Sequence, residues 1–176
     1  SKLGASFDSV TLETTRAPER IWGVELAANV NITDAIRAGG NLTVMDSKTD
    51  ADSDGVYEGP LDYSRVPPTI MFTYVEMDFL EGWRARLQAT TLFDESRFDA
   101  PFGTSQRDIE GYTLFDLLVS GPVLGGTLSM GIENLFNNQY TPFVTYMNCS
   151  DSPFFDAFCN TQGVGARGTL KYSIKY

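Results

Sequence analysis

Apolar and polar residues alternate along much of this chain, and a period of two predicts β-strands with one apolar and one polar face. The last stretch is the clearest, because Leu170, Tyr172, Ile174 and Tyr176 alternate with polar or charged residues. The same alternation marks residues 22–32, 37–45, 83–94, 111–120 and 127–133. Residues 69–77 also read as a strand whose apolar residues do not choose a side, and residues 3–13 are a weaker candidate that Pro18 is expected to end. The pattern therefore predicts seven or eight strands.

The predicted connections alternate in length. Short connections cover residues 33–36, 79–82 and 121–126, and long ones cover 47–66, 95–108 and 137–163. Short turns at one end and long loops at the other are typical of bacterial outer-membrane barrels, whereas loops of more than about 15 residues are uncommon in compact soluble domains. Strands of about 9–11 residues match a tilted crossing of a bilayer. We therefore expect an all-β, antiparallel transmembrane β-barrel segment, with its long loops extracellular and its C-terminus periplasmic.

This orientation also sorts the aromatic and charged residues. Trp22 and Tyr112 are expected near the outer rim, and Phe79, Trp83 and Tyr176 near the inner rim, as aromatic girdles require. The polar face of the strands is expected to carry charges of both signs, facing a plug or water. These residues are Glu25, Arg37, Arg84, Arg86, Asp94, Asp116, Glu133, Lys171 and Lys175.

Composition excludes several classes of function. A net charge of −10 argues against nucleic acid as a partner. The sequence contains no histidine, which excludes a Ser-His-Asp triad and a His-ligated metal within this chain. No acid–base pair stands out, so we do not expect an enzyme. No run of 18 apolar residues exists that would form a transmembrane helix.

Several stretches resemble the TonB-dependent outer-membrane transporters of the siderophore receptor type. Residues 131–140, which read Gly-Ile-Glu-Asn-Leu-Phe-Asn-Asn-Gln-Tyr, resemble the penultimate-strand motif of that family. Residues 165–168, which lead into the last strand, resemble its closing motif, and residues 22–26 and 111–116 fit its strand openings. The resemblance covers residues 20–176, nearly the whole chain.

The resemblance implies a fold and a function. Such transporters are 22-stranded barrels with a plugged lumen, so residues 1–176 would form the C-terminal part of the barrel, about eight strands, without the plug domain or the TonB box. The implied function is energy-coupled uptake of a scarce ligand, most often a ferric siderophore. The implied partners are outer-membrane lipid, the remaining strands and plug of the same receptor, the TonB complex acting through that plug, and the barrel-assembly machinery. The assembly signal would comprise Gly168, Tyr172, Ile174 and Tyr176.

An acidic loop is a candidate cation site. Asp50, Asp52 and Asp54, followed by Gly55 and by Glu58, match the opening of a calcium-binding loop, in which alternate carboxylates wrap a hard cation. Leu61 occupies the place of the usual twelfth-position glutamate. A solvated acidic loop is the favoured interpretation and Ca²⁺ binding is the alternative.

Two further predictions concern the long loops. Cys149 and Cys159 are expected to form a disulfide, which an oxidising exterior favours. Aromatic rings and guanidinium groups suit a bulky, anionic ferric chelate, although packing of the loops explains each residue equally well. The candidates for ligand contact are Tyr57, Tyr63, Arg65, Phe102, Arg107, Tyr140, Phe143 and Tyr146.

Three alternatives remain open from the sequence. The strand count permits a complete small eight-stranded outer-membrane barrel with a structural or adhesion role. An outer-membrane enzyme is disfavoured by the missing histidine. A soluble β-sandwich binding module is disfavoured by the loop asymmetry and the aromatic end.

Overall fold

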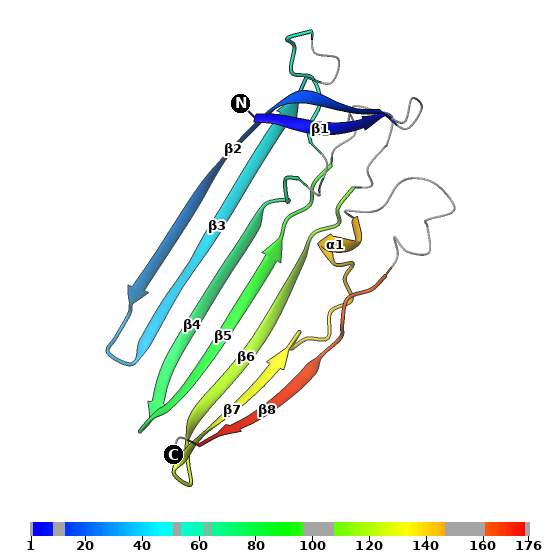
Figure 1. Cartoon of the computed structure of the whole chain (residues 1–176). Helices are drawn as coiled ribbons and strands as arrows, with labels where there is room; N and C mark the ends of the chain where they lie inside the picture. Colours follow the sequence, from blue (N-terminus) through cyan, green and yellow to red (C-terminus); the bar gives the residue numbers. More distant parts are fainter. Residues whose placement is uncertain are drawn as a thin grey trace.

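The computed structural model describes residues 2–8, 13–50, 54–61, 63, 65–96, 108–146 and 161–174. Eight strands lie side by side in chain order in one antiparallel sheet (Figure 1). They are β1 (Lys2–Asp8), β2 (Glu13–Asn31), β3 (Ile36–Thr49), β4 (Ile70–Leu80), β5 (Trp83–Leu92), β6 (Tyr112–Val123), β7 (Gly126–Glu133) and β8 (Arg167–Ser173). A one-turn helix, α1 (Phe143–Tyr146), follows β7. Within the described residues, no helix is long and apolar enough to cross a membrane.

The strand register gives the sheet two chemically distinct faces. Val75 of β4 lies opposite Ala38 and Leu87, Leu87 lies opposite Leu117, and Leu117 lies opposite Ile132. Apolar side chains thus line up across the strands on what we call the apolar face. One residue along, Glu76 lies opposite Arg37 and Arg86, on what we call the polar face. The alternation predicted from the sequence is therefore confirmed across β3 to β7.

The structure settles the strand whose facing the sequence left open. In β4, Val75, Met77 and Phe79 lie on the apolar face, while Tyr74, Glu76 and Asp78 are the better covered residues on the polar face. Phe72 shares the face of Tyr74 because the two are separated by one residue. The apolar pattern was ambiguous because two aromatic rings lie among the charges of the polar face.

The first two strands correct the sequence prediction. Residues 3–13 were expected to form one strand ended by Pro18, but β1 ends at Asp8 and β2 runs from Glu13 through Pro18. Proline interrupts a ladder through its missing N–H. Here the last pair between β2 and β3 is Glu19 with Thr49, and the Pro18 carbonyl accepts a hydrogen bond from the Asp50 N–H beyond it. The missing donor therefore falls at the end of this ladder.

The three short connections are turns at the same end of the sheet (Figure 1). The Thr33 hydroxyl oxygen accepts hydrogen bonds from the N–H groups of Ala35 and Ile36, and Gly82 supplies a positive φ of 74°. The third turn is shorter than the predicted span of 121–126, since only Leu124 and Gly125 form it, with φ values of 48° and 77°. Two consecutive positive φ values fit the tight turns that match the twist of a hairpin.

The main buried cluster lies under the long loops rather than between layers of the sheet. Tyr63, Leu92, Ile109 and Tyr146 are buried together. Ile70, Tyr112 and Phe143 pack against this cluster, which we call the loop core. Because Ile70 lies opposite Leu92 and Leu92 opposite Tyr112, the loop core covers the polar face where β4, β5 and β6 meet the long loops.

Candidate functional site

The apolar face carries aromatic side chains at both ends. Trp22 and Phe93 are exposed at the long-loop end, and the described residues at the short-turn end include the aromatic side chains of Phe79, Trp83 and Tyr172. Trp83 is the first residue of β5 and Phe93 follows its last residue. The two are ten residues apart, which corresponds to about 33 Å of extended chain. At the usual tilt of barrel strands this spans about 25 Å, the height of the apolar band of outer-membrane barrels. The apolar face therefore has the dimensions of a lipid-facing wall.

One predicted girdle residue is on the other face. Tyr112 lies at the long-loop end as expected, but it is opposite Leu92 in the loop core, and its ring lies 4.6 Å from that of Tyr140. The predicted rim position of Tyr112 is therefore confirmed, but the girdle role predicted for it is wrong, because its ring lies on the polar face. The sequence carried the correcting signal, because Thr113 and Phe115 follow the apolar face and Tyr112 must then point the opposite way. Phe136, packed edge-on against Phe115 at 5.3 Å, supplies an exposed aromatic ring near this end instead.

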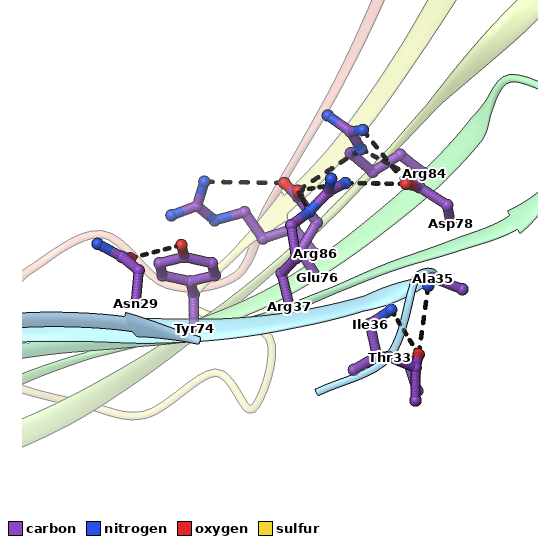
Figure 2. A network of polar contacts seen from close by, with 10 residues as sticks. All are labelled: Asn29, Thr33, Ala35, Ile36, Arg37, Tyr74, Glu76, Asp78, Arg84 and Arg86. Carbon is purple, nitrogen blue, oxygen red and sulfur yellow. Dashed lines mark hydrogen bonds and ion pairs between the residues drawn. The ribbon is translucent and has the colours of Figure 1, made fainter. Parts of the chain in front are cut away.

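Five charged residues on the polar face form what we call the ion network: Arg37, Glu76, Asp78, Arg84 and Arg86 (Figure 2). Arg37 reaches Glu76 at 3.1 Å and Asp78 at 2.8 Å, and Arg84 reaches Asp78 at 2.8 Å. The strands β3, β4 and β5 contribute these residues at directly opposed positions. The three arginines belong to the predicted polar-face set, whereas their partners Glu76 and Asp78 lie on the strand whose facing the sequence left open.

Arg86 is held differently from the other two arginines. Its guanidinium carbon lies 4.0 Å from the Tyr74 ring centroid and 5.7 Å from that of Phe72. Its contact with Glu76 is longer, at 4.0 Å. The Tyr74 hydroxyl in turn donates a hydrogen bond to Asn29 at 2.8 Å. Phe72 and Tyr74, the aromatic residues that made the apolar pattern of β4 ambiguous, therefore position the Arg86 guanidinium.

The other described charges of the predicted polar-face set lie outside the ion network, and Glu25 of β2 lies opposite Thr43 of β3. Gln88 donates a hydrogen bond to Asp116 at 3.0 Å, and Arg167 pairs with Glu133. Asp94 accepts a hydrogen bond from the Gly111 N–H at 2.8 Å. Lys171 lies opposite Ser129 in the register of β7 and β8. Lys175 lies outside the described residues.

Asn134 connects β6 with the segment that follows β7 and the segment that precedes β8, a role that the sequence did not reveal. It is 4% exposed and has a positive φ of 49°. Its side-chain amide donates to the carbonyls of Asn138 and Val164, and its side-chain oxygen accepts from the Asn138 N–H. Its own N–H donates to Asp116. The stretch that carries the family resemblance therefore fixes where the chain leaves β7 and where it returns before β8.

The six predicted ligand residues that the structure describes do not gather at one open site. Tyr63 is 1% exposed and Tyr146 is buried with it in the loop core, against which Phe143 packs. Tyr140 covers Gly163 and stacks near Tyr112. For these four residues the structure favours the loop-packing interpretation.

Two candidates lie elsewhere and two are not described. Tyr57 lies beneath the Arg20 guanidinium at 3.8 Å, and Arg65 pairs with the buried Glu19 at 2.6 Å. Phe102 and Arg107 lie outside the described residues. The contact of all eight with ligand stays a prediction.

The acidic loop has an internal structural role. Both carboxylate oxygens of Asp50 accept backbone hydrogen bonds, from the N–H groups of Asp54 and Gly55, at 3.1 and 3.0 Å. Asp52 lies outside the described residues, and the described part of the chain contains no group of three acidic or cysteine side chains arranged for a metal. Calcium binding by Asp50, Asp52, Asp54 and Glu58 stays a prediction.

The remaining predicted residues are those of the assembly signal in the last strand and the two cysteines. Gly168 and Tyr172 lie in β8, with Ile174 just beyond it. The Tyr172 hydroxyl donates to the carbonyls of Val123 and Leu124, at 3.0 and 3.1 Å, across the adjacent turn. Tyr176, Cys149 and Cys159 lie outside the described residues.

Comparisons with known proteins find two receptors and one transporter that are similar to this chain. The chain is 35% identical over 133 residues to the ferric aerobactin receptors of Escherichia coli and Klebsiella pneumoniae, which covers 75% of this chain and 17% of each relative. Among solved structures, the copper transporter OprC covers 93% of this chain with a TM-score of 0.74 and 20% identity, and the match takes in 25% of that protein. No family model matches the chain. The chain spans about a sixth of the length of the curated relatives that it matches. The ferric aerobactin receptors, as relatives, support the expectation that the chain is not an enzyme.

Proposed function

We propose that this chain, which belongs to the TonB-dependent outer-membrane receptors as part of the barrel, serves energy-coupled uptake of a ferric siderophore. The observation that carries the proposal is the 35% identity to ferric aerobactin receptors. The two-faced sheet supports it, because an apolar outer face and a polar lumen face are what the wall of such a barrel needs.

The proposal assigns a partner to each surface. The apolar face contacts outer-membrane lipid, and the polar face with its ion network faces the plug of the same receptor. The free edges of β1 and β8 pair with the remaining strands, since each is paired on one side only within the described sheet. The TonB complex acts through the plug, the long loops lie outside the cell, and the barrel-assembly machinery reads the end formed by β8.

Uptake by the full-length receptor tests the proposal. Cells deleted for the receptor and cells carrying it are grown under iron limitation and given radiolabelled ferric aerobactin as the probe. Iron should accumulate only in cells with the receptor, and a protonophore should abolish the accumulation. Accumulation that does not depend on the receptor or on energy would overturn the proposal. Accumulation of copper in place of iron would contradict the proposal that the transported ligand is a ferric siderophore.

Two loop features are part of the proposal and have tests of their own. If Asp50, Asp52, Asp54 and Glu58 bind Ca²⁺, a chelator should lower the melting temperature of the receptor, and an unchanged melting temperature would argue for a plain acidic loop. If Cys149 and Cys159 form a disulfide, neither should react with a thiol reagent until a reductant is added.

A further inference from the structure

We propose that Arg86 binds a carboxylate side chain of the segment that fills the lumen of the same receptor. This inference rests on the proposed function, because it requires a plugged barrel, and it adds the residue and the chemistry by which wall and plug meet. It begins from the charges of the ion network. Three guanidinium groups surround only two carboxylates there, which leaves one positive charge.

The register adds to this local excess. The row of opposed residues that contains Asp78 and Arg84 continues through Ser120 and Ser129 to Lys171. The neighbouring row continues from Arg86 to Leu118 and Gly131, which adds no charge. The chain as a whole has a net charge of −10, so a cationic excess on these two rows is a local departure from its general character.

Within the network, Arg86 is the cation whose charge is least compensated. Arg37 and Arg84 each approach a carboxylate oxygen to 2.8 Å, whereas Arg86 reaches Glu76 only at 4.0 Å. Its Nε is buried without a hydrogen-bond partner, and its side chain remains 32% exposed. Cation–π contacts hold the guanidinium over Tyr74 (Figure 2), which reduces the entropy that binding would otherwise cost. A preorganised guanidinium of this kind suits a carboxylate, whose two oxygens match its paired donors.

The position of the network favours a lumen segment over a transported ligand. Asp78 and Arg84 form the last pair but one before the short turn at Glu81 and Gly82, at the end of the sheet opposite the long loops (Figure 1). A ligand that arrives from the long-loop end meets the loop core first. Large barrels of the transporter class hold a plug in the lumen, and about five-sixths of each curated relative lies outside the matched part.

Zero-length cross-linking of the full-length receptor tests this inference. In the variant Arg86→Lys, a carbodiimide activates a nearby carboxylate, the lysine amine attacks it, and an amide forms as the urea by-product leaves. Mass spectrometry should then find residue 86 joined to an aspartate or glutamate outside residues 1–176. In the control Arg84→Lys, whose position already faces Asp78 at 2.8 Å, the dominant link should be to Asp78.

A second variant keeps the test independent of Arg86 itself. Leu118 lies directly opposite Arg86 on the polar face, so Leu118→Lys should give a link to the same external carboxylate with Arg86 intact. Links from positions 86 and 118 only to Glu76, or no links in receptor that retains its heat-modifiable gel mobility, would overturn the inference. Loss of iron uptake with the external link present would instead count against the proposed function alone.

Discussion

At the scale of single residues, the side chain of Asn134 makes three hydrogen bonds to the backbone of neighbouring segments. We expect Asn134→Ala to lower the free energy of unfolding by about 2 kcal/mol, because it leaves two carbonyls and one N–H without their partner and places alanine at a positive φ. The midpoint temperature at which the receptor loses the gel mobility of its folded form measures this effect. The exposed Asn41 on β3 provides the matched control, and equal midpoints for Asn134→Ala and Asn41→Ala would contradict the assigned role.

Gly121 is the second residue for which the structure predicts the effect of a substitution. A Cβ added there would overlap the Trp83 ring, whereas a Cβ at Gly168 meets open space. Gly121→Ala should therefore destabilise the receptor by about 1–3 kcal/mol through displacement of Trp83, and Gly168→Ala should be close to neutral. Urea titration of receptor refolded in vitro compares the two variants, and the same midpoint for both would show that Trp83 does not depend on this glycine.

The limit of sequence prediction is visible at this scale. The motif around Asn134 was recognised by resemblance, but its partners are backbone carbonyls, one of them 30 residues further along the chain, which no side-chain pattern encodes. Tyr63 and Tyr146 were candidates for ligand contact because aromatic loop residues suit both binding and packing. Only their burial in the loop core separates these two roles.

At the scale of elements, the period of two was enough to find the strands and to divide their faces. It worked because the sheet has one apolar and one polar face, so that successive residues of each strand alternate in character. It was insufficient where aromatic residues occupy the polar face, as Phe72 and Tyr74 do in β4 under Arg86. It also missed the extension of β2 through Pro18. Proline is tolerated there because its missing N–H lies just beyond the last pair between β2 and β3, and the sequence does not show where β3 ends.

Adjacent residues of β5 test the assignment of the two faces. Leu87 lies on the apolar face about midway between Trp83 and Phe93, and Gln88 on the polar face contacts Asp116. We expect Leu87→Arg to cost about 2–4 kcal/mol of folding free energy in liposomes. Gln88→Arg should cost little, because Asp116 can pair with the new cation. Reversed penalties would show that the faces are assigned the wrong way round.

At the scale of the whole molecule, the sheet is open. β1 pairs with β2 and β8 with β7, and the described sheet contains no pairing of β8 with β1. An open sheet with an apolar face exposes edges that promote aggregation, so the arrangement fits part of a larger barrel better than the small closed barrel that the strand count also permitted. The sequence could predict membership of a barrel from its local pattern. The ion network and the loop core arise from residues far apart in the chain, so the pattern could not show them.

The most direct test of this account is the intact mass of the native polypeptide extracted from the outer membrane, together with its gel mobility before and after boiling. We expect a single polypeptide several times larger than the 19.4 kDa of this chain, because the curated relatives are about six times as long as the part that this chain matches. It should migrate faster when it is not boiled. A native polypeptide of about 19.4 kDa with the same heat-dependent mobility would mean a self-closed small barrel and would contradict the assignment to a plugged transport receptor.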